Sequence, residues 1–204
     1  MCRWRIYSLL IRISDIKTLI TNSEFPIPFM SQDIRFPKGK YLPQPFSSKQ
    51  KEEWLLDIKF LPSELELAVQ NLDEQQLQTP YREGGWTVHQ LVHHIADSHM
   101  NAYMRFKLGL TEDNPTIKPY DQDAWAKLED TKILPINVSL TLLHALHQRL
   151  FAMLKDLNEN DWERTVFHPE HKKKISLWEL LGMYAWHGKH HVAHIKNLRE
   201  KKNW

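Results

Sequence analysis

Cysteine is nearly missing from this chain of 204 residues, which contains one, Cys2. A single cysteine excludes an internal disulfide and a zinc site built from several thiolates, as expected for a protein of the reducing cytoplasm. An excess of charge of one sign is also missing, because the formal net charge is only +2 with neutral histidines. Lys and Arg alternate with Asp and Glu, so the chain lacks the basic footprint of nucleic-acid-binding proteins.

Long hydrophobic runs are absent as well. No apolar run approaches the roughly 18 residues that a membrane-spanning helix needs, so we expect no membrane association. The short apolar patch at residues 7–11 is interrupted by Arg12 and Asp15, and no small-residue cleavage site follows it. A signal peptide is therefore not expected, and we predict a cytoplasmic location.

Residues 1–29 differ in composition from the rest of the chain. We expect natural translation to begin at Met30, so that residues 1–29 are either an upstream mis-start or a disordered arm. The remaining residues, 30–204, have the length and hydrophobic content of a single globular domain with a sizeable core.

Amphipathic segments with few strand signals dominate the domain. Apolar residues recur at i, i+3 and i+4 in four segments, and two of these begin with capping boxes, Thr87 with Gln90 and Ser176 with Glu179. We expect Pro62 to kink or divide the first helix. These features predict an all-α, up-down four-helix bundle with long connecting loops. The predicted helices cover residues 48–72, 88–110, 138–157 and 177–199, with a short helix near 121–128 and a hairpin or extended loop at 165–176.

Histidine is the residue that is present in excess. Residues 187–194 contain four of the twelve histidines. Side chains four positions apart share a helical face, so His187 with His191, or His190 with His194, can hold one metal ion. On a helical wheel, His187 and His191 lie nearest the apolar face, which makes them the inward pair. A third ligand must come from another helix.

The second helix offers more than one candidate for that ligand. His99 lies near the centre of its apolar stripe, His94 lies at the edge of the stripe, and His93 points away. Periodicity alone favours His99, although a ligand that faces a neighbouring helix often lies at the edge of a stripe.

A family resemblance bears on this choice. The chain from about Met30 to its end resembles the DinB-like superfamily of metal-binding four-helix bundles, specifically the YfiT type, described as metal-dependent hydrolases. The resemblance implies three metal ligands, His94, His187 and His191, and a homodimer; His99 remains the alternative to His94. The matching stretches are residues 79–88, 93–101 and 105–108, Arg149 after His147, His168 with Pro169, and residues 184–187 with His190 and His191.

Three neutral imidazoles leave a divalent ion with at least one open position, which is typical of catalytic sites. Zinc is the favoured ion by ligand type, with nickel as a second choice. A water at the open position becomes a nucleophile near neutral pH, which predicts hydrolysis of a small electrophilic substrate. The alternative is a metal-dependent S-transferase that uses a low-molecular-weight thiol similar to bacillithiol. A third hypothesis is a metal-binding or interaction module without catalysis.

Polar residues near these histidines are candidates to orient the ligands, because a ligating imidazole usually donates its second N–H to a neighbouring acceptor. Each also has an ordinary interpretation as a packing or surface residue. We interpret Trp86 mainly as a hydrophobic staple with Leu91, and His168 mainly as an ordinary loop histidine, with a contact at the mouth of the site as the alternative. The orienting candidates are Asp97, Ser98, Asn101, Arg105, Tyr184 and His190.

Overall fold

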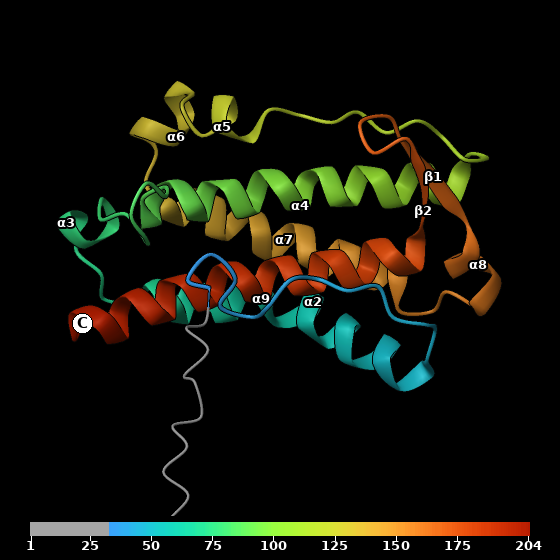
Figure 1. Ribbon diagram of the computed structural model, residues 1–204, viewed down its shortest axis with the longest axis horizontal. Coiled ribbons are helices and arrows are strands. Elements are labelled where there is room, and N and C mark those ends of the chain that lie inside the picture. Colours follow the sequence, from blue (N-terminus) through green and yellow to red (C-terminus); the bar gives the residue numbers. More distant parts are fainter. Residues whose placement is uncertain (1–32) are drawn as a thin grey trace, which may run out of the picture. The chain divides into compact units, whose positions relative to one another are not determined.

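Long helices account for most of the computed structural model, which describes residues 33–204 (Figure 1). The predicted mis-start or arm at residues 1–29 lies outside the described residues. No helix in the described range is long and apolar enough to cross a membrane. The four long helices are α2 (Ser48–Val69), α4 (Val88–Thr111), α7 (Ile136–Leu154) and α9 (Leu177–Lys202).

The helix starts follow the capping signals in the sequence. The Thr87 hydroxyl accepts from Gln90 N–H, and the Gln90 side chain accepts from Thr87 N–H, which completes the predicted capping box of α4. Ser176 likewise caps α9 by accepting from Glu179 N–H. The second half of that predicted box does not form, because the Glu179 carboxylate instead accepts from Lys173 Nζ at 2.7 Å.

The helix α2 is continuous through Pro62. Of the two predicted effects of this proline, division of the helix does not occur, and a kink remains a prediction. A proline lacks an N–H and crowds the preceding turn, which destabilises a helix interior. Here the helix is supported by packing on both sides of Pro62, since Ile58, Leu61 and Leu65 are all buried.

The directions of the helices follow from the residues that meet across the bundle. His93 contacts Ser139 and His99 stacks on His147, so α4 and α7 are parallel. The pair α2 and α9 is also parallel, whereas α4 is antiparallel to α9 and α2 is antiparallel to α7. The predicted four-helix bundle is confirmed. The direction of the helices does not alternate at every step along the chain, because one long crossover joins the parallel helices α4 and α7.

Shorter elements lie in the connections. The crossover between α4 and α7 contains α5 (Gln122–Trp125) and α6 (Glu129–Ile133), which agrees with the predicted short helix. A hairpin before α9 pairs β1 antiparallel to β2, with Val166 opposite Ile175. The remaining elements are α3 (Glu74–Leu77), α8 (Glu159–Glu163), β1 (Thr165–His168) and β2 (Lys173–Ser176).

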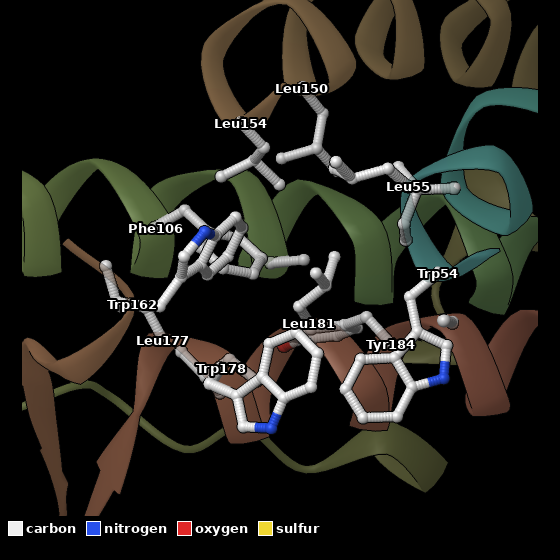
Figure 2. Close-up of a cluster of buried hydrophobic side chains, with 14 of the residues drawn as sticks. Trp54, Leu55, Phe106, Leu150, Leu154, Trp162, Leu177, Trp178, Leu181 and Tyr184 are labelled. Carbon is white, nitrogen blue, oxygen red and sulfur yellow. The ribbon is translucent and has the colours of Figure 1, made fainter. Parts of the chain in front are cut away.

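The apolar core consists of two clusters along the bundle. One contains the aromatic residues Trp54, Phe106, Trp162, Trp178 and Tyr184 and lies toward the hairpin end (Figure 2). The other is mainly aliphatic and lies around α3 and the C-terminal part of α9. Between them, in sequence order along the helices, lie buried or partly buried histidines: His99 on α4, His147 on α7, and His187 and His191 on α9. A polar layer therefore interrupts the apolar core.

Gly188 allows α2 and α9 to approach closely, because a Cβ atom at this position would lie 2.5 Å from Leu61 Cδ2. We expect Gly188→Ala to lower the free energy of unfolding by about 1 kcal/mol, since overpacking of about 1–3 kcal/mol exceeds the gain in helix propensity of about 1 kcal/mol. Urea denaturation measures the difference. In a Leu61→Ala background, the same change fills space and should not destabilise the protein; equal losses in both backgrounds would contradict the steric explanation.

Candidate metal centre

Three imidazoles from two antiparallel helices meet inside the bundle. His94 lies on α4, and His187 and His191 lie one turn apart on α9. One ring nitrogen from each of the three lies within 4.8 Å of the other two. The Nε2 atom of His187 is 3.3 Å from Nε2 of His94 and 3.0 Å from Nε2 of His191.

This spacing fits a shared metal ion. Zinc binds imidazole nitrogen at 2.0–2.1 Å in tetrahedral geometry, which places two ligand nitrogens about 3.3 Å apart. The ring planes of His187 and His191 are nearly perpendicular, at 86°, so the two rings approach one point from different directions. The Nδ1 atoms of both rings are buried and have no hydrogen-bond partner among the described residues.

Burial keeps these imidazoles neutral. It lowers the pKa of His94 to about 4 and, with the other imidazoles nearby, the pKa values of His187 and His191 well below 6.5. Desolvation disfavours the charged form of histidine, and only the neutral form has a lone pair for a metal. The three imidazoles are thus in the protonation state that can bind a metal at neutral pH.

His99, the alternative ligand from periodicity, lies directly beside this cluster. Its ring is completely buried, stacks on His147 with centroids 4.8 Å apart, and lies 5.7 Å from the centroid of His187. Neither ring nitrogen of His99 has a partner among residues 33–204. His147 Nδ1 donates to the Ile58 carbonyl, and its Nε2 is likewise without a partner among the described residues. Since that carbonyl only accepts, Nδ1 of His147 carries the proton.

A second histidine pair lies on the other side of α9. The Nε2 atoms of His190 and His194 are 3.2 Å apart, and both side chains are buried. Trp186 stacks on His190, and Tyr81 packs against His194. His190 is buried although it does not belong to the inward pair, and the ring of Phe36 lies 6.1 Å from it between centroids.

The remaining polar candidates differ in their position. Asn101 donates to the Asp97 backbone carbonyl, which is a local contact within α4. Asp97 is half-buried, and burial raises the pKa of its carboxyl group to about 6.

Trp86 packs against His94, with ring centroids 4.6 Å apart, and its indole N–H donates to the Asp123 carboxylate. Trp86 therefore contacts the candidate ligand His94 in addition to lying at the start of α4.

A cavity of about 540 Å³ reaches His187 from the hairpin side of the bundle. His187 is the member of the cluster that remains partly exposed. The cavity wall includes Ser98 and Arg105 of α4, Tyr120 of the crossover and His168 at the end of β1. His168 thus lines the cavity, which agrees with the less favoured interpretation of this residue.

Arg105 and Tyr184 connect this cavity to the centre. Arg105 Nη1 donates to Tyr184 Oη at 2.7 Å, and Nη2 donates to the Lys118 carbonyl at 3.3 Å. Tyr184 precedes His187 by three residues, and their ring centroids are 6.4 Å apart. Burial raises the pKa of Tyr184, so its hydroxyl stays protonated at neutral pH.

Sequence reasoning missed two residues of this region. Tyr120 lies in a connection without helical or strand periodicity, so no pattern relates it to the site. His147 lies on α7 without a partner at i+4 that would mark it as a ligand. Its burial among the apolar residues of α7, between Leu143 and Leu150, is the one signal that could have identified it.

The buried histidines should make the metal-free protein sensitive to mild acid. The pKa values of His94 and His147 lie near 4 in the fold, against 6.5 for an ordinary histidine, so between pH 6.5 and 4 only the unfolded chain binds these protons. Stability is therefore full above pH 6.5 and falls by about 1.4 kcal/mol per pH unit for each such group as the pH decreases. Urea denaturation after chelation, at pH 7.5, 6 and 5, tests this; His147→Asn should reduce the slope, and equal stability at all three values would refute the burial argument.

Comparison with known proteins agrees with the fold. Residues 58–195 match the model of the DinB superfamily. The chain is 50% identical over 173 residues to a protein of Bacillus cereus (strain 03BB102) and to one of Bacillus thuringiensis subsp. konkukian (strain 97-27). Each alignment covers 84% of this chain and 99% of the relative, and both relatives are named "Putative metal-dependent hydrolase".

A solved structure shows the same architecture. YfiT from Bacillus subtilis, described as "a probable metal-dependent hydrolase with an unusual four-helix bundle topology", superimposes with a TM-score of 0.82 at 45% sequence identity. The match covers 85% of this chain and 99% of YfiT. The resemblance seen in the sequence is thus confirmed, and the chain belongs to the DinB superfamily.

Proposed function

We propose that this protein is a divalent-metal-dependent hydrolase with His94, His187 and His191 as its metal ligands. The observation that carries the proposal is the convergence of three neutral Nε2 atoms at distances of 3.0 and 3.3 Å, with one of the rings open to a cavity. Three imidazoles do not complete the coordination of a divalent ion, so one position remains for a water or a substrate. The names of the relatives support the same reaction class.

Zinc is the proposed ion, because an all-imidazole ligand set suits it, and nickel is the second choice. When bound, zinc lowers the pKa of a coordinated water to about 7 and polarises a carbonyl group. The residues of the chain hold and orient the reactants. His187 faces the cavity, Tyr184 supplies a protonated hydroxyl next to it, and Arg105 fixes the position of that hydroxyl.

The proposal extends to the setting of the enzyme. We propose a small-molecule substrate, because the cavity of about 540 Å³ has the size of a small-molecule site. A cytoplasmic location is consistent with the single cysteine. A homodimer is the expected assembly of the family resemblance; light scattering that gives one chain per particle at micromolar concentration would contradict it.

Metal content tests the ligand assignment directly. We expect about one zinc per chain in the wild-type protein after reloading, and less than a tenth of that in His94→Ala or in His187→Ala/His191→Ala, because two imidazoles or one cannot retain the ion. His99→Ala is the matched control on the same helix and should keep its metal. Elemental analysis gives the ratio, and circular dichroism confirms the helical fold of each variant. Loss of metal in His99→Ala but not in His94→Ala would reverse the assignment.

Catalysis is tested with an activated ester such as p-nitrophenyl acetate. We expect zinc-loaded protein to hydrolyse it without any added thiol, and chelation or His94→Ala to reduce the rate at least a hundredfold, since removal of a catalytic group typically costs several kcal/mol. Release of p-nitrophenolate measures the reaction.

The two other hypotheses give different results in the same assay. Consumption of an electrophile only when a low-molecular-weight thiol is present would identify the S-transferase. One bound metal with no turnover of either substrate class would identify a metal-binding module without catalysis.

A further inference from the structure

The wall of the cavity beside the metal centre includes Arg105 and Tyr120, whose buried Nε and Oη atoms have no hydrogen-bond partner by geometry among the described residues. Ser98, Arg105, Tyr120 and Tyr184 lie at or next to the part that reaches His187. Buried donors without acceptors are costly, at about 1–3 kcal/mol each, so a protein rarely keeps them unless a ligand satisfies them.

Arg105 is the central donor. It makes none of the ion pairs in residues 33–204. Its two protein partners are neutral oxygen atoms, Tyr184 Oη and the Lys118 carbonyl, and its buried Nε has no partner in the described range. A guanidinium has five N–H donors and keeps its charge at all physiological pH values. Arg105 is therefore a fixed cation that lacks a counterion.

Tyr120 adds a second unsatisfied donor. Its hydroxyl is buried, and the Ser98 hydroxyl donates to its oxygen; no acceptor for the Tyr120 O–H is found among the described residues. Burial raises the pKa of Tyr120 to about 12, although the hydrogen bond from Ser98 lowers it, so the O–H group remains a donor at neutral pH. Packing against Trp125, with ring centroids 4.5 Å apart, holds Tyr120 in place.

The other cation of the cavity wall is already neutralised. Lys173 Nζ is 2.7 Å from the Glu179 carboxylate, and both line the cavity. Burial lowers the pKa of His168, which therefore stays neutral. Glu170 also lines the cavity, but it is exposed and forms no ion pair with the described residues, and Asp97 does not line the cavity. The positive charge that remains near His187 thus belongs to Arg105.

We propose that Arg105, together with Tyr120, binds a carboxylate group of the substrate and so places the reacting carbonyl at the metal centre. This inference rests on the proposed function, and it defines the substrate class as a small ester or amide with a negatively charged carboxylate. The planar fork of a guanidinium matches a carboxylate with two parallel hydrogen bonds. Arg105 donates a hydrogen bond to Tyr184, which precedes His187 by three residues on α9. Helix α9 therefore connects the proposed carboxylate site to the histidine cluster.

The test measures binding to metal-free protein, so it does not depend on turnover or on the metal. Calorimetric titration of chelated wild-type protein with succinate, and with uncharged succinamide as the control ligand, should show tighter binding of succinate. Arg105→Gln should weaken succinate binding at least tenfold, since a hydrogen bond to a charged group contributes about 1.5–3 kcal/mol. Arg149→Gln removes the same charge from an exposed position on α7, outside the cavity, and should change binding less than twofold.

A second variant keeps the test decisive if Arg105→Gln does not fold. Tyr120→Phe removes a donor that has no acceptor among the described residues, so it should leave the helical circular dichroism unchanged and weaken succinate binding about threefold or more. Equal binding of succinate and succinamide, or equal succinate affinity in wild type, Arg105→Gln and Tyr120→Phe, would overturn the proposal. Inorganic phosphate serves as a further probe, and stronger binding of phosphate than succinate would reject the carboxylate as the recognised anion.

Discussion

The structure depends on the burial of neutral imidazoles in the middle of a helical bundle. His94, His99, His147 and His191 are each less than a tenth exposed, and together with His187 they separate an aromatic core cluster from an aliphatic one. Burial of polar groups is unfavourable unless they are hydrogen-bonded or bound to a metal. The apolar clusters on both sides stabilise the fold enough to hold these rings close together.

The topology of the bundle creates the meeting point. Because α4 runs antiparallel to α9, His94 comes to the level of His187 and His191 rather than to the level of the first residues of α9. The parallel arrangement of α4 and α7 requires a long crossover, and this connection carries Tyr120 to the cavity beside the centre. The loop that makes the topology unusual also supplies part of the site.

The site combines two kinds of electrostatic environment. The cluster of His94, His187 and His191 lies in an apolar surrounding that keeps imidazole neutral, whereas the wall of the adjacent cavity carries a permanent cation, Arg105, and the protonated phenol of Tyr120. A neutral electrophile would use only the first of these. A substrate with a negative group near its reacting carbonyl would use both, and the short distance between them would set its orientation.

Local sequence determined much of this protein. The 3.6-residue periodicity and the capping residues Thr87 and Ser176 located the long helices, and the spacing of His187 and His191 identified the inward pair, because a helix alone fixes which side chains share a face. The third histidine was different: periodicity favoured His99, and His94 was preferred only through the family resemblance.

Only the tertiary structure decided which helices run parallel and how the rings of different helices meet, since these depend on packing between residues far apart in the chain. It also decided that Pro62 stays inside a continuous helix, that Glu179 pairs with Lys173 instead of completing a cap, and that Tyr120 faces a cavity. In each case a contact across the bundle or hairpin outweighed a local preference, and no local pattern in the sequence encodes such a contact.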